Sequence, residues 1–194
     1  AIIDLIPMMN SRLRLLFIAL TVIQTTGTVD GQNRFIDRNG TASFFSSAPM
    51  EDIEAQNHQA VSILDIKTGE VVASMLMRSF DFKKALMQEH FNENYVESHT
   101  YPKASFNGKV LNIDQVDLTR QGKYTLDVEG DMTIHGVTQP IRIQAEAEVE
   151  GETLRAKAVF PIRVKDYKIE IPRLVVRNIA EVVEVTVSFN YKPM

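Results

Sequence analysis

The stretch "GKYTLDVEGDMTIHGVTQPIRIQAEAEVEG" (residues 122–151) contains two long runs in which apolar and polar side chains alternate. Successive side chains of a β-strand leave opposite faces of the sheet, so a period of two predicts half-buried antiparallel strands. The segment "HGVTQP" between the runs contains Gly136 and Pro140, which are typical of a turn. The stretch therefore predicts a long hairpin within a large curved sheet that has one dry face and one wet face.

The remaining chain predicts further strands and little helix. Strand patterns cover the ranges 33–49, 53–80, 101–113, 153–164 and 181–193. We expect a turn at Gly40 within the first range and a turn at Thr68–Gly69 within the second. Helical spacing occurs in 81–95, with Asp81 as the expected N-cap. Because long strands would expose open edges, we predict a closed antiparallel barrel of about eight strands with one or two short helices.

The inward face of this barrel is rich in small residues. Ala145 and Ala147 lie in one run of the hairpin, and Ala156 and Ala158 lie in the next alternating run. Small side chains on adjacent strands leave space and predict a ligand-sized apolar cavity, unless large residues from the opposite wall fill it. The lining candidates are the inward residues of the alternating runs: Met75, Met77, Tyr124, Leu126, Val128, Met132, Ile134, Ile141, Ile143, Ala145, Ala147, Leu154, Ala156, Ala158 and Phe160.

Residues 1–31 have the pattern of a secretory signal peptide. From Met9 onward, Arg12 and Arg14 precede the apolar run Leu15–Ile23, and small and polar residues follow. The run is shorter than the ~20 residues that span a bilayer, so we expect no stable membrane insertion. Residues before Met9 do not fit such a signal and indicate an over-extended start of translation. We expect an exported chain with one barrel domain at residues 32–194.

Composition excludes several classes of protein. The 194 residues carry a formal net charge of -4 and include neither cysteine nor tryptophan. A negative chain without a basic run is not typical of nucleic-acid binding. The lack of cysteine excludes disulfides, thiolate zinc sites and catalytic thiols. The sequence contains no nucleophile elbow, glycine-rich phosphate loop or HExxH motif, so we predict no catalytic residues, no metal site and no enzyme activity.

The histidines offer two places to look for chemistry. His135 stands at the join of the hairpin. It could be a metal ligand, a polar contact to the headgroup of a ligand, or a corner residue whose ring nitrogen bonds a neighbouring backbone group. We favour the corner role, because no second ligand stands beside it at a usual metal spacing. His90, with Glu89 and Glu93, lies within one helical turn, which is more typical of a solvated helix face than of a metal site.

Three segments make the chain resemble the YceI-like family. They are the hairpin "YTLDVEGDMTIHGVTQPIRI" (124–143), the segment "FKKALMQEHFNENYVESHTYPKASFNGKV" (82–110) and "VKDYKIEIP" (164–172). The last departs from the family pattern, because Val164 and Lys165 replace a common arginine. The resemblance implies an all-β fold, an extended antiparallel lipocalin-like β-barrel that encloses a long-chain isoprenoid lipid.

The resemblance further implies a bacterial periplasmic or secreted protein that carries, stores or sequesters its ligand. A polyprenyl chain or an isoprenoid quinone is the expected ligand, and no other cofactor is expected. Two alternatives stay open: a barrel enzyme that modifies a lipid, and a filled barrel that acts only as an interaction module. A homodimer is a further open possibility, whereas nucleic acid is not an expected partner.

Overall fold

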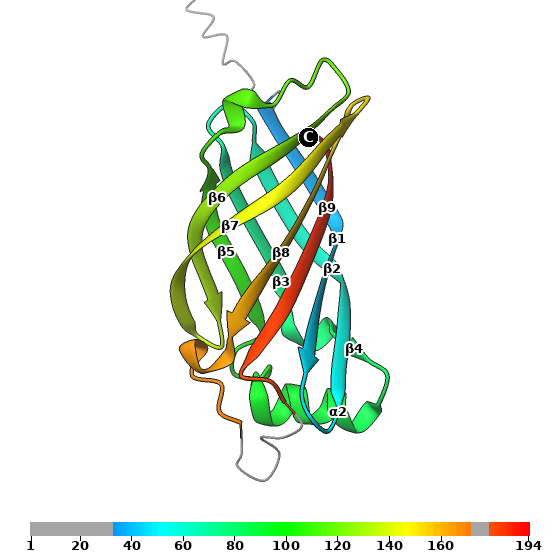
Figure 1. Cartoon of the computed structure of the whole chain (residues 1–194), viewed down its shortest axis with the longest axis vertical. Coiled ribbons are helices and arrows are strands. Elements are labelled where there is room, and N and C mark those ends of the chain that lie inside the picture. The colour runs from blue at the N-terminus through cyan, green and yellow to red at the C-terminus, as the bar shows by residue number, and fades with distance from the viewer. Residues whose placement is uncertain (1–32, 172–178) are drawn as a thin grey trace, which may run out of the picture.

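The computed structural model describes residues 33–171 and 179–194 and shows a closed antiparallel β-barrel (Figure 1). A two-residue strand, β4 (Asp81–Phe82), extends the sheet beside β2. The predicted signal peptide lies outside the described residues. The long strands are β1 (Arg34–Ser47), β2 (Asp52–Asp65), β3 (Glu70–Leu76), β5 (Lys103–Val110), β6 (Gly122–Ile134), β7 (Val137–Glu150), β8 (Thr153–Arg163) and β9 (Val182–Pro193).

The order of the strands confirms the predicted barrel. Around the ring it is β1-β9-β8-β7-β6-β5-β3-β2, and the pairing of β1 with β2 closes it. Most neighbours in space are neighbours in sequence. Tight turns join β1 to β2, β2 to β3, β6 to β7 and β7 to β8, whereas longer segments make the other connections. A closed ring leaves few open strand edges, which explains how strands of up to 14 residues are accommodated.

The β6–β7 hairpin matches the prediction except at its turn. Its ladder runs from Gly122 opposite Val149 to Ile134 opposite Val137, so only His135 and Gly136 remain in the turn. Both have positive φ angles, 51° and 71°, which is the backbone twist that a two-residue hairpin loop needs. The placement of Pro140 in the turn was wrong, because Pro140 pairs with Asp131 inside β7.

The turn expected at Gly40 is also wrong. The strand β1 passes through Gly40 without reversing, and its pairing register with β2 shifts on both sides of this residue. Such a shift is a β-bulge, which bends a strand and does not end it. A Cβ atom at Gly40 would lie 2.3 Å from Cδ1 of Phe189 on β9, so the glycine provides the space in which that ring packs.

One short helix lies across one end of the barrel (Figure 1). The helix α2 (Ala85–His90) continues into a π-helical turn, η4 (Phe91–Tyr95). The N-cap predicted at Asp81 is wrong, because Asp81 pairs with Gln56 in β4 and α2 begins only after Lys84. Short 3-10 turns lie at η3 (Met77–Ser79), η5 (Ile113–Gln115) and η6 (Val164–Tyr167).

The two ends of the barrel contain different segments. The end that we call the α2 end contains α2, η4, η6 and the β1–β2 and β6–β7 turns (Figure 1). The opposite end, called the far end, contains the β2–β3 and β7–β8 turns and the loop 111–121. In the described part of the chain, two hydrophobic clusters fill the interior, a larger one that reaches the far end and a smaller one at the α2 end.

The wall of the barrel is discontinuous between β7 and β8. Their ladder covers only Ala145–Glu150 of β7, and within the described residues the rest of β7, toward the α2 end, pairs with β6 alone. The turn η6 contacts β7, and Gln139 Nε2 donates a hydrogen bond to the carbonyl oxygen of Asp166 at 2.9 Å. The Gln139 side chain therefore connects β7 to η6 on the side where, among the described residues, β7 has no strand partner.

Candidate functional site

A cavity of about 290 Å³ opens at the α2 end of the barrel, and we call it the outer cavity. Its walls come from the strands around the ring and from α2 and η4, and they are mainly apolar. Phe44, Phe80, Phe82 and Phe91 form an aromatic group in this wall, with ring centroids 5.0 to 5.8 Å apart in the five recorded pairs. Aromatic side chains provide large apolar contact areas, which suits an apolar ligand.

The helical segment contributes one face to the outer cavity. Met87, Phe91 and Tyr95 all line it and are spaced four residues apart, which places them on one side of α2 and η4. π-helical turns inside α-helices frequently occur at functional sites. The segment is fixed to the barrel by Gln88, whose Oε1 accepts a hydrogen bond from the backbone N–H of Phe82 at 3.3 Å.

The outer cavity also has polar side chains in its lining, and we consider those from α2, η4 and the β1–β2 turn. Glu51, His90 and Tyr95 contribute to its lining. Glu51 forms an ion pair with Lys84, the residue before α2, so its charge is already compensated. Burial raises the pKa of the Tyr95 hydroxyl, which therefore remains a hydrogen-bond donor at neutral pH. The ring of His90 and this hydroxyl give the cavity groups that can donate to a ligand oxygen.

A second cavity of about 110 Å³ lies deeper in the barrel, and we call it the inner cavity. Its lining includes Ser62 and Tyr191, whose hydroxyl oxygens are 2.7 Å apart. Ser62 Oγ donates to the carbonyl oxygen of Val72 at 2.8 Å, so the Tyr191 hydroxyl donates to Ser62. Burial raises the pKa of Tyr191 to about 12. The inner cavity thus contains a neutral polar pair that satisfies its own hydrogen bonds.

The structure brings most of the predicted lining residues to these cavities. Met75, Met132 and Phe160 line both of them. Met77 and Ile134 line the outer cavity only. Six residues line the inner cavity only: Leu126, Val128, Ile143, Ala145, Ala156 and Ala158.

Four predicted lining residues lie outside both cavities as the described residues define them. Leu154 and Ala147 are packed in the larger hydrophobic cluster, with 0% and 4% of their surface exposed. Ile141 lies opposite Gly130 of β6. Tyr124 lies toward the far end, where its ring contributes to closing the barrel. Alternation identifies the inward face of a strand but not the height at which the interior is hollow.

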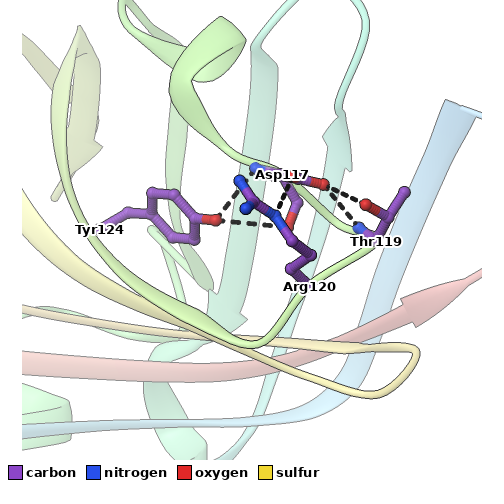
Figure 2. A network of polar contacts seen from close by, with 4 residues as sticks. All are labelled: Asp117, Thr119, Arg120 and Tyr124. Carbon is purple, nitrogen blue, oxygen red and sulfur yellow. Dashed lines mark hydrogen bonds and ion pairs between the residues drawn. The ribbon is translucent and has the colours of Figure 1, made fainter.

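Figure 2 shows how Tyr124 and the loop 111–121 close the far end. The Tyr124 hydroxyl donates to the carbonyl oxygen of Asp117 and accepts from its backbone N–H, at 3.3 and 3.2 Å. The Asp117 carboxylate accepts from the hydroxyl and N–H of Thr119 at 2.6 and 2.9 Å, and from Arg120 Nε at 2.8 Å. These hydrogen bonds, those of Thr119 foremost, lower the pKa of Asp117 to about 2. The network fixes the loop by polar contacts.

His135 connects three segments at the α2 end. Its Nδ1 lies 3.1 Å from the carbonyl oxygen of Tyr167 in η6, and its Nε2 lies 2.6 Å from Oε2 of Glu97. The ring of Tyr101 packs edge-on at a centroid distance of 4.5 Å. The predicted bond to a backbone group is confirmed, although the carbonyl belongs to a residue distant in sequence. Three or more metal-ligating side chains do not gather anywhere in residues 33–171 and 179–194.

Sequence reasoning missed the wall contributed by β1, β9 and the helical segment. Phe44, Phe91 and Tyr95 were not among the candidates, although all three line the outer cavity. Val185 and Val187 of β9 line it too. The sequence contained the signal for β9, because its alternate residues are apolar from Val183 to Tyr191. It did not indicate that the short helix covers the end of the barrel.

Comparison with known sequences gives a family and partial relatives. A profile of the YceI-like domain matches residues 16–191. A UPF0312 protein of Vibrio cholerae is 30% identical over 83 residues, and one of Vibrio parahaemolyticus is 35% identical over 86 residues. These regions cover 42% and 44% of this chain and 40% of each relative, so the chain spans less than half the length of the curated relatives it matches.

Comparison with solved structures gives the same fold. A polyisoprenoid-binding domain from Saccharophagus degradans, implicated in plant cell wall breakdown, has a TM-score of 0.72 at 17% identity, covering 84% of this chain and 99% of that domain. BcnA of Burkholderia cenocepacia has a TM-score of 0.62 at 18% identity, covering 78% of this chain and 94% of BcnA. Within the described residues, no helix is both long and apolar enough to cross a membrane.

Proposed function

The chain belongs to the YceI-like family, and from this membership we propose that its barrel binds a long-chain isoprenoid, either a polyprenyl chain or an isoprenoid quinone. The fold and the family support a barrel that binds an apolar ligand. The identity of that ligand as an isoprenoid is the proposal. It is supported by the polyisoprenoid-binding domain of Saccharophagus degradans, which has the same fold.

The observation that carries the proposal is the outer cavity with its aromatic wall. Its volume of about 290 Å³ is close to the lower limit of typical ligand pockets, ~300 Å³, and the inner cavity continues deeper into the barrel. Each methylene-sized group moved from water to such a wall contributes ~0.8 kcal/mol to binding. Met75, Met77 and Met87 in the wall have unbranched side chains that adapt to the methyl branches of an isoprenoid.

We place the polar end of the ligand at the α2 end. The His90 ring and the Tyr95 hydroxyl are donors in the lining of the outer cavity, and quinone carbonyl or alcohol oxygens are acceptors. The walls deeper in the barrel are mainly apolar, and the donors of Ser62 and Tyr191 are already used. This distribution orients a ligand with its tail inward.

We propose further that the protein carries or sequesters its ligand after export, as a binding protein and not as an enzyme. The family and the polyisoprenoid-binding neighbour favour binding over catalysis. The signal peptide predicted at residues 1–31 supports a periplasmic or secreted location. N-terminal sequencing of the exported protein should give a first residue near Thr28 or Gln32.

Native mass spectrometry of the purified protein, followed by lipid extraction, tests the proposed ligand. We expect a bound isoprenoid, or uptake of an added isoprenoid quinone at one molecule per chain. A protein that neither copurifies with an isoprenoid nor takes up an added one would contradict the proposal.

Phe44 and Phe45 provide a matched pair of variants for this test. They are adjacent in β1, but Phe44 lines the outer cavity and Phe45 is 42% exposed. Phe44→Asp places a charge in the apolar wall and should abolish quinone binding, because an unpaired carboxylate is costly to bury. Phe45→Asp should leave binding unchanged. Melting temperatures of both variants show whether each one is folded, and equal binding by both would count against the cavity as the site.

A further inference from the structure

The outer and inner cavities share five lining residues, which we call the collar: Met75, Ala104, Met132, Phe160 and Val187. The five residues come from five strands, β3, β5, β6, β8 and β9. A set of residues that lines both cavities lies between them. The collar therefore lies between the outer and the inner cavity, and its residues come from five of the eight strands of the ring.

The pairing of the strands places the collar at one level of the barrel. Met75 lies directly opposite Ala104 in the β3–β5 ladder. Phe160 of β8 pairs directly with Val185 of β9, which is two residues from Val187. The collar also marks the border between the two hydrophobic clusters, because Met75 and Val187 pack against both of them. The collar thus lies where one hydrophobic cluster gives way to the other.

Two of the collar side chains are well suited to movement. Met75 and Met132 are only partly buried, and methionine has three rotatable bonds and no branch. The residue opposite Met75 is Ala104, which occupies little of the space between the strands. Rotation of the two methionines would therefore change the space between the two cavities without any movement of the backbone.

Beyond the collar, the available length is short. The inner cavity has a volume of about 110 Å³, less than half that of the outer cavity. Its lining includes the hydrogen-bonded Ser62 and Tyr191, whose hydroxyl protons are both in use. An apolar chain that passes the collar gains a limited apolar contact surface. It then reaches the Ser62–Tyr191 pair, which has no free hydroxyl proton to donate to it.

We propose that the collar selects the ligand by the length of its apolar chain. A short chain occupies the outer cavity alone. A longer isoprenoid chain displaces the side chains of Met75 and Met132 and places its end in the inner cavity. This inference rests on the proposed function, and it adds that the preferred ligand is an isoprenoid long enough to cross the collar.

The test compares two ubiquinones, one with two isoprene units in its tail and one with eight. Binding of each is measured for the wild type, Met132→Phe and Ile134→Phe. Ile134 is the matched control, because it follows Met132 on the same face of β6 but lines the outer cavity alone. Melting temperatures are recorded for every protein.

We expect the wild type to bind the long-tailed quinone more tightly. Met132→Phe should weaken the long-tailed complex by about tenfold to a hundredfold, the loss that follows when a few methylene groups stay in water. It should weaken the short-tailed complex much less, because a short tail meets Met132 only at the inner limit of the outer cavity. Ile134→Phe should weaken both complexes alike. If Met132→Phe affects both quinones equally or neither, the collar has no role in selection.

A second variant keeps the test valid should Met132→Phe fail to fold. Met132→Ile changes the volume little but stiffens the side chain by branching at Cβ. It should slow the uptake of the long-tailed quinone in stopped-flow measurements more than that of the short-tailed quinone. Unchanged uptake rates for both would overturn the role of the collar. A wild type that binds neither quinone would overturn the proposed function as well.

Discussion

The two ends of the barrel are closed in different ways. At the far end, the loop 111–121 is fixed by polar contacts, and Figure 2 shows those of Asp117 with Tyr124, Thr119 and Arg120. In the same loop, the amide Nδ2 of Asn112 donates to the carbonyl oxygen of Thr125 and its Oδ1 accepts from the N–H of Asp127, both in β6. At the α2 end, aromatic rings and a short helical segment surround the outer cavity. Directional bonds fix one end, whereas apolar contacts that a ligand can replace form the other. We infer that the far end supplies stability and the α2 end supplies binding.

The largest expected effect tests the stability of the far end. Leu154 is fully buried in the larger cluster and lines neither cavity among the described residues. Leu154→Ala should lower the free energy of unfolding by about 2–5 kcal/mol, because it removes buried methyl groups and leaves a void. Urea denaturation measures this loss. Quinone binding at a temperature where the variant is folded should be unchanged, and a parallel loss of binding would remove the distinction between the two ends.

A pair of alanines sharpens the comparison within the barrel. Ala147 and Ala156 are direct partners in the β7–β8 ladder, but only Ala156 lines the inner cavity. Ala147→Phe should cost about 1–3 kcal/mol through overpacking and leave binding intact. Ala156→Phe should destabilise less, because its ring has space to enter, and should weaken binding of a long-tailed quinone. Melting temperature and quinone binding, recorded together, decide between these outcomes, and identical behaviour of the two variants would contradict the assigned cavity.

His135 is a polar anchor at the α2 end, so its removal tests how much that end depends on directional bonds. His135→Ala removes the contacts to Tyr167 and Glu97 and should lower the free energy of unfolding by about 1 kcal/mol. Quinone binding should remain nearly intact. Thermal denaturation gives the loss. A stoichiometric metal ion that is present in the wild type and absent from the variant would show instead that His135 is a metal ligand.

The smallest effect concerns acid stability at the far end. The pKa of Asp117 falls from 3.8 to about 2 on folding, so its ionised form stabilises the fold above pH 3.8. This contribution is lost as the pH falls toward 2, because the carboxylate becomes protonated. In Asp117→Asn the contribution is absent throughout. The difference in melting temperature between wild type and variant should therefore shrink from pH 4 to pH 2, and a constant difference would mean that the charge of Asp117 contributes nothing.

The fold was largely predictable from alternation, and the exceptions have local causes. The pattern in 122–151 specifies a hairpin because a shift of one residue would turn every apolar side chain outward. The same pattern does not distinguish a bulge from a turn, so Gly40 was misassigned. The alternating pattern also does not show whether a proline ends a strand or lies inside it. Pro140 lies inside β7, at a position that is outside the β7–β8 ladder.

The candidate site was less predictable than the fold, because it depends on which strands and helical turns contribute residues to the same level of the barrel interior. Ala145, Ala156 and Ala158 reach the inner cavity, whereas Ala147 shares their pattern but packs in the core. The aromatic wall joins Phe44 to Phe91, 47 positions apart in the printed sequence. The spacing of residues within a single strand does not predict a contact between segments that are distant in sequence.

The incomplete β7–β8 ladder has a consequence for the behaviour of the protein at high concentration. In residues 33–171 and 179–194, β7 from Val137 to Gln144 has a strand partner on one side only and is in effect an edge strand. Exposed strand edges invite pairing between molecules and lead to aggregation. Pro140 lies in this stretch and lacks the N–H that an incoming strand would need, and Gln139 binds η6 beside it. We therefore expect Pro140 and η6 to make this stretch of β7 a poor template for a strand of another molecule.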